Sequence, residues 1–308
     1  MKFARICFAS DNRKRTVWDR LPEFIRRKYY LDFYKQHYEN IKMFSSMGEL
    51  VSLPFRKDEC DFFLVSEYLK KVSEYLKNND VGVVCVQKGI QMPYGVKTAY
   101  GDRLLCFMAE DIVNTACKIR NLNLDESEIT VIDGGENTTE ILLNILSRRV
   151  SRLYVYTLRQ EKLKPVFEDI FEETGLCIVS FSAANDSLMS KSDIVINLNH
   201  GNLFMNCFSK NTVYIDIAGD SRCTEYTLDT RKDITVIENF TVRQDKTDIP
   251  IDYTEAALSA AKPYMHRAVF GEFSKDVFQK THRYIKSFGF DIICVIDSDI
   301  RKSKALTM

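Results

Sequence analysis

The residues with the clearest chemical potential form a short turn, residues 133–138 (DGGENT), between the apolar segment Ile129–Asp133 and an amphipathic stretch. A glycine turn between a strand and a helix brings backbone amides close to a phosphate, and the helix N-terminus favours its negative charge. The usual fingerprint has three glycines. Here Gly135 holds the middle position, and Asp133 and Thr138 hold the outer two. We expect a nucleotide diphosphate to bind at Gly134, Gly135, Asn137 and Thr138.

Two features of the turn favour the alternative, a domain of the same fold that binds no ligand. Glu136 places a negative charge where the diphosphate is expected, which opposes binding unless its side chain turns to solvent. Asn137 and Glu140 match the capping-box pattern, which explains both residues as structural.

The next predicted strand, Leu153–Thr157, indicates which dinucleotide the turn prefers. NAD sites usually carry Asp or Glu at this strand tip, where the carboxylate binds the ribose hydroxyls. This tip has no acid and instead offers Arg159 and Lys162, whose charges suit the 2′-phosphate of NADP. The alternative is that both are solvated residues of the following helix.

Three further segments complete a family pattern: Val51-Ser52-Leu53-Pro54-Phe55-Arg56-Lys57, Tyr100-Gly101-Asp102, and Ser192-Asp193-Ile194-Val195-Ile196-Asn197. With the position of the glycine turn, they resemble the shikimate dehydrogenase family and, more loosely, glutamyl-tRNA reductase and acyl-carrier reductase domains. The lysine position of the first segment holds Arg56, and Lys57 follows it, so the chain resembles a degenerate member.

The resemblance implies hydride transfer between NADP and a small carbonyl or alcohol. It implies that Lys57 and Asp102 share the proton-transfer role, and that Asn197 ends a strand beside the nicotinamide. Lys88 and Lys97 flank the loop before Asp102 and are rival bases.

Other reactive side chains lie outside these motifs. His200 follows the predicted strand Ile194–Leu198, at the edge where ligands bind, and is a third catalytic candidate. Cys106 and Cys117 are the candidates for a thioester mechanism, a weaker idea because that mechanism needs an activated thiolate. The nine scattered cysteines form no CxxC pair, and no metal site is expected.

The elements that must position these residues form an α/β pattern. Residues 1–102 alternate strands and helices and are expected to form an N-terminal α/β, substrate-type domain. Residues 103–252 begin with a linking helix and continue with near-continuous apolar strands separated by helices, which indicates a Rossmann-type parallel sheet. Residues 253–308 are mostly helical and are expected to pack back between the domains.

Composition limits the function further. The 308 residues include 43 basic and 43 acidic side chains, so no net charge favours nucleic acid. No signal peptide or membrane span is recognisable, and the unpaired cysteines fit a cytoplasmic protein. The aromatic-rich first hundred residues could form core or interface, which leaves a homodimer open. Two functions remain: an NADP-dependent oxidoreductase acting on a small molecule, or a non-catalytic Rossmann-like binding or scaffold protein.

Overall fold

The computed structural model describes residues 1–8, 22, 25, 37–53, 62–86, 92–93, 95–135, 137–182, 186–199, 204–219 and 221–296. By its internal contacts the chain divides into two compact units. Unit 1 comprises Met1–Gly101 and Asp252–Phe270, and unit 2 comprises Asp102–Ile251 and Gly271–Met308. The C-terminal part therefore contributes one segment to each unit, and its packing between domains stays a prediction.

Unit 1 is built on a five-stranded sheet. Its strands are β1 (Lys2–Cys7), β2 (His37–Met43), β3 (Ser46–Ser52), β4 (Val81–Cys85) and β5 (Lys97–Ala99). They lie in the order β2-β3-β1-β4-β5, and only β2 runs antiparallel to its neighbour. Neither the hairpin strand β2 nor the three-residue strand β5 was predicted from the sequence.

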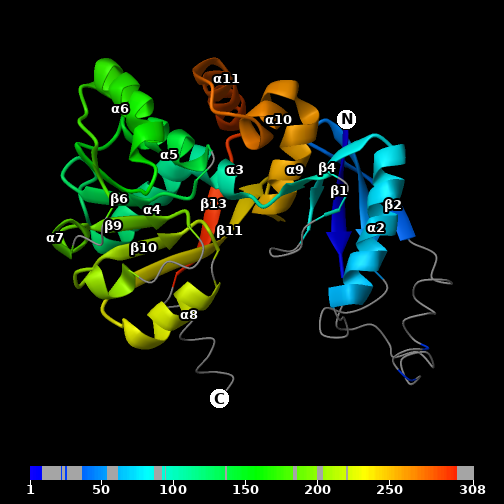
Figure 1. Ribbon diagram of the computed structural model, residues 1–308, viewed down its shortest axis with the longest axis horizontal. Helices are drawn as coiled ribbons and strands as arrows, with labels where there is room; N and C mark the ends of the chain where they lie inside the picture. Colours follow the sequence, from blue (N-terminus) through cyan, green and yellow to red (C-terminus); the bar gives the residue numbers. More distant parts are fainter. Residues whose placement is uncertain are drawn as a thin grey trace. The chain divides into compact units, whose positions relative to one another are not determined.

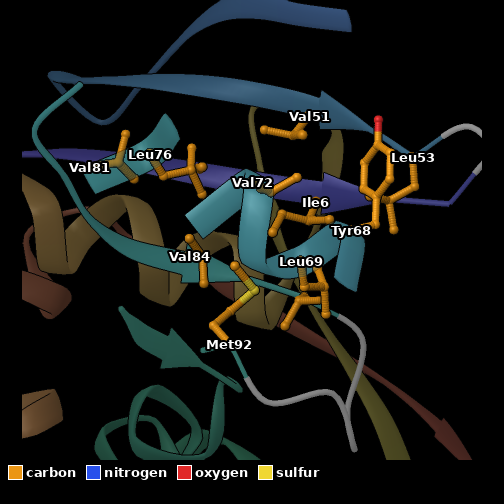
Figure 2. Packing of buried hydrophobic residues seen from close by; sticks show 12 residues of the cluster. Ile6, Val51, Leu53, Tyr68, Leu69, Val72, Leu76, Val81, Val84 and Met92 are labelled. Carbon is orange, nitrogen blue, oxygen red and sulfur yellow. The ribbon is translucent and has the colours of Figure 1, made fainter. Parts of the chain in front are cut away.

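Helices cover both faces of this sheet (Figure 1). Helix α2 (Phe62–Asn78) packs Tyr68, Val72 and Leu76 onto one face, as Figure 2 shows, and the helix was predicted from this apolar spacing. Helix α9 (Ile251–Ala261) packs against the other face, where Ala256 and Ala257 contact a cluster containing Phe3. Helix α10 (Pro263–Phe270) completes the unit.

Unit 2 contains an eight-stranded sheet. Its strands are β6 (Glu128–Ile132), β7 (Arg152–Tyr156), β8 (Val179–Phe181), β9 (Ile194–Asn197), β10 (Val213–Asp216), β11 (Thr235–Gln244), β12 (Thr247–Pro250) and β13 (Asp291–Ile296). Its helices are α3 (Asp102–Phe107), α4 (Ala109–Arg120), α5 (Thr138–Leu146), α6 (Gln160–Thr174), α7 (Asp186–Met189), α8 (Ser221–Thr230) and α11 (Lys275–Lys286), with a 3-10 turn at Phe204–Cys207.

The parallel strands of unit 2 lie in the order β8-β7-β6-β9-β10-β11. Numbered along the chain from one to six, this is the Rossmann order 3-2-1-4-5-6. Figure 1 shows α5 and α6 on one side of the sheet and α8 on the other. The predicted α/β class, with a parallel Rossmann-type sheet, is confirmed. The predicted linking helix is two helices, which meet at Met108.

None of the helices in the described ranges is long and apolar enough to cross a bilayer. Within the same ranges, no group of three or more His, Cys, Asp or Glu side chains is placed to hold a metal ion.

Candidate functional site

The glycine turn of unit 2 lies where a Rossmann fold places its ligand. It connects the carboxyl end of β6 to the start of α5, and β6 lies between β7 and β9. From β6 the chain moves outward to β7 and β8 and then returns to β9 on the other side of β6, so the strand order reverses beside β6 and marks the topological switch point. The sequence predicted the position of this turn correctly.

The side chain of Asp133 fills the interior of the turn. Its Oδ1 atom accepts hydrogen bonds from the Gly135 amide at 3.0 Å and from the Thr139 hydroxyl at 2.5 Å. Its Oδ2 atom accepts one from the Thr157 hydroxyl at 2.6 Å. The side chain is 6% exposed, so it is almost wholly surrounded by protein. The carboxylate thus occupies donors that a phosphate would need.

Arg159 reaches back from the tip of β7 to the same carboxylate. Its Nε lies 2.8 Å from Asp133 Oδ2, and its Nη2 lies 2.8 Å from Asp133 Oδ1. Its Nη1 lies 3.3 Å from Oε1 of Glu140, on the first turn of α5. We call Asp133, Thr139, Glu140, Thr157 and Arg159 the Asp133 cluster.

The protonation of the cluster follows from these contacts. Burial by itself would raise the pKa of Asp133, but the hydrogen bonds from Arg159, Thr139, Thr157 and the Gly135 amide outweigh it and lower the pKa to about 2. Asp133 is therefore an anion at neutral pH. Burial raises the pKa of Glu140, which Arg159 only partly offsets.

The two glycines are shaped by packing inside the turn. Gly135 has a φ of +76°, a conformation that glycine adopts without strain. A Cβ atom on Gly134 would lie 2.2 Å from the Leu198 carbonyl oxygen, so the turn presses directly onto the segment after β9. Asn199 strengthens this contact by donating from Nδ2 to the Asp133 carbonyl oxygen at 3.2 Å. The turn at Gly134 and the segment after β9 are thus in direct backbone contact.

The predicted capping box does not form. Asn137 is the N-cap of α5, but its side chain makes no capping hydrogen bond. Its Oδ1 instead accepts from Arg103 Nε at 3.0 Å, and its Nδ2 donates to the Gly271 carbonyl oxygen at 2.9 Å. The Thr138 hydroxyl donates to the Gly135 carbonyl oxygen at 2.8 Å. The side chains of Asn137 and Thr138, both predicted to bind the diphosphate, therefore already have hydrogen-bond partners within unit 2.

Other predicted residues are dispersed. Asn197 ends β9, where its Nδ2 donates to Asp216 Oδ1 at 3.2 Å. Lys162 is an exposed residue of α6 and does not belong to the Asp133 cluster. Asp102 begins α3, and Lys97 begins β5. Lys57, Lys88, Glu136 and His200 lie outside the described residues, so their predicted roles remain predictions.

The two cysteines considered for a thioester mechanism lie in packed helices. Cys106 in α3 is fully buried, and Cys117 in α4 is 6% exposed. Burial raises the pKa of Cys117, which keeps the thiol protonated at neutral pH. A nucleophilic cysteine needs the opposite shift.

These side chains do not fit NADP bound in the usual way. A diphosphate at the turn would meet the ionised Asp133 carboxylate, and a 2′-phosphate would have to draw Arg159 away from two carboxylates. From the sequence, Asp133 was predicted to replace a glycine and Arg159 to bind a phosphate, but their ion pair was not predicted. The sequence did contain a signal for this ion pair: an acid stands at the first glycine position, and an arginine follows the neighbouring strand.

Comparison with known proteins gives no family. No family model matches the chain, and no curated protein matches it. A Thermococcus litoralis Δ1-pyrroline-2-carboxylate reductase, solved with NADH and L-proline, is 16% identical, with a TM-score of 0.27; the match covers 38% of this chain and 36% of that one. The iminosuccinate reductase of Paracoccus denitrificans, solved with NAD+, is 15% identical, with a TM-score of 0.27; the match covers 36% of this chain and 35% of that one.

A putative aspartate carbamoyltransferase from Trypanosoma cruzi is 13% identical over a longer range, 76% of this chain and 77% of that one, with a TM-score of 0.35. At these identities and scores the similarities assign no activity. The resemblance to shikimate dehydrogenases stays a prediction.

Proposed function

We propose that this chain is a non-catalytic binding protein whose second unit keeps the Rossmann architecture but does not bind a dinucleotide at its glycine turn. The observation that carries the proposal is the two-contact ion pair between Arg159 and Asp133, with both distances at 2.8 Å. The ion pair engages Arg159, the residue that was predicted to bind the 2′-phosphate of NADP.

The charge balance of the Asp133 cluster supports the proposal. Asp133 is ionised, and Arg159 already neutralises it across a bidentate contact. Drawing Arg159 toward a phosphate would leave a nearly buried carboxylate without its cation. Breaking such a pair costs about 3–5 kcal/mol, which a ligand would have to offset before any net binding.

The test is a thermal shift of the full chain with NADP, NADPH, NAD and NADH at millimolar concentration. We expect none of the four to raise the melting temperature. A bound nucleotide at about 100 times its Kd would add about 2.7 kcal/mol of stability, which is readily detected. A saturable shift with any of them would overturn the proposal.

A second candidate is an oxidoreductase that uses a nicotinamide dinucleotide, and the strand order of unit 2 favours it. In that case NADP would shift the melting temperature more than NAD, and Arg159→Ala would abolish the difference. An exposed control, Arg243→Ala, would leave it unchanged. Such an oxidoreductase would act on a shikimate-type substrate through the Lys57–Asp102 pair, as a homodimer and without a nucleic-acid partner.

A further inference from the structure

Unit 1 contains an arginine whose position in the sheet is unusual. Arg5 lies on β1, on the face that also carries the fully buried Phe3, and pairs in register with Cys85 of β4. Its guanidinium carbon lies 4.9 Å from the centre of the Tyr253 ring on α9. A cation on a core-facing strand position normally has a carboxylate or carbonyl partner.

Among the residues that the structure describes, Arg5 has no such partner. Within the described residues, its guanidinium makes neither a hydrogen bond nor an ion pair, and its contact with the Tyr253 ring is a cation–π contact. Stacking uses the flat face of a guanidinium and leaves the N–H donors along its edge available. Arg5 thus holds a fixed, partly buried set of donors without an acceptor.

The topology of unit 1 places Arg5 where ligands bind. The four parallel strands β1, β3, β4 and β5 lie in the order β3-β1-β4-β5, which is the second, first, third and fourth along the chain. This is the start of the flavodoxin-like order, in which the switch point falls between the first and third strands. Those strands are β1 and β4, and Arg5 and Cys85 lie on them toward their carboxyl ends.

From these observations we propose that Arg5 and Tyr253 form a binding site for a small carboxylate at the switch point of unit 1. The edge of the guanidinium binds the two oxygens of the carboxylate, and the ring of Tyr253 holds the guanidinium in place. We call Arg5, Cys7, Cys85, Asp252 and Tyr253 the Arg5 site.

The surroundings of Arg5 favour a singly charged ligand. Burial raises the pKa of both the Cys7 and Cys85 thiols, so they stay neutral and do not repel an anion. Asp252 lies near enough to raise the pKa of the same two thiols further. Its negative charge disfavours a doubly charged phosphate more than a carboxylate.

The ring of Tyr253 also contacts a second residue of β1, Phe3. Its centroid lies 5.6 Å from that of Phe3, a tilted aromatic contact in the core of unit 1. Ordering Arg5 against this ring before a ligand arrives lowers the entropy that binding must overcome. The site is independent of the glycine turn, so it can be tested apart from the proposed function.

The experiment is calorimetric titration of the full chain with acetate, pyruvate, succinate, L-alanine and inorganic phosphate at millimolar concentrations. We expect saturable binding of at least one carboxylate and none of phosphate. Arg5→Lys keeps the charge but loses the planar fork, and should weaken the carboxylate by at least about tenfold. Arg267→Lys, at an exposed position of the same unit, should leave the affinity unchanged.

Two further variants keep the test decisive. If Arg5→Lys does not fold, Tyr253→Leu should weaken carboxylate binding while Tyr253→Phe retains it. Asp252→Asn should allow phosphate to bind. The proposal is overturned if no carboxylate binds, if Arg5→Lys or Tyr253→Leu binds as the unaltered chain does, or if phosphate binds the unaltered chain more tightly than every carboxylate.

Discussion

Arg159 and Asp133 face each other across the carboxyl ends of two neighbouring strands and make two parallel contacts of 2.8 Å. The pairing of Ile132 with Tyr156 brings these strand tips together. The same register that gives a Rossmann domain its ligand edge therefore brings the two charges into contact.

The ionised state of Asp133 predicts an acid-dependent loss of stability. Because its folded pKa of about 2 lies below the usual 3.8, its contribution is complete above the usual value and is lost as the pH falls toward 2. Urea unfolding should show the stability difference between the unaltered chain and Asp133→Asn narrowing by about 1 kcal/mol between about pH 6 and about pH 3. A constant difference would mean that Asp133 is not held as an anion.

Removing the cation should destabilise unit 2 more than removing a surface arginine. Arg159→Met leaves Asp133 without its ion-pair partner inside the turn, and we expect a loss of about 3 kcal/mol in the free energy of unfolding. Arg243→Met breaks an exposed pair with Asp248 and should cause no measurable change. Equal losses in the two variants, measured by urea unfolding, would contradict this account.

Gly134 should tolerate alanine less well than another glycine of unit 2. A Cβ atom at Gly134 would lie 2.2 Å from a backbone oxygen, which cannot move as a side chain does. We expect Gly134→Ala to cost about 2–3 kcal/mol. Gly175 has a φ of +74° and open space around it, so Gly175→Ala should cost about 1 kcal/mol from conformation alone. Thermal unfolding of both variants gives the comparison, and the reverse order would contradict the close contact.

Much of unit 2 could be predicted because its strands are buried on both faces. Continuous apolar runs such as Ile194–Asn197 leave little choice of structure, and the glycine turn follows from the strand before it. Short or half-exposed strands carry less signal. β12 has four residues, none of them buried, and the sequence analysis missed it.

The chemistry of the turn was harder to predict than its position. Asp133 and Arg159 are 26 residues apart, and each has a familiar separate interpretation. Their contact depends on the register of two strands, which local patterns do not contain. The same holds for Arg5 and Tyr253, which belong to distant parts of the chain and meet only because α9 packs on the sheet of unit 1.

The division of unit 1 into two segments also governs the order in which this protein can mature on the ribosome. Its five strands are synthesised first, yet one face of their sheet is covered only by residues 252–270, which are translated after residues 102–251 of unit 2. Phe3, Val83 and Cys85 therefore lack α9 while the intervening segment emerges. The sheet of unit 1 can therefore be covered on both faces only after residues 102–251 of unit 2 have been translated.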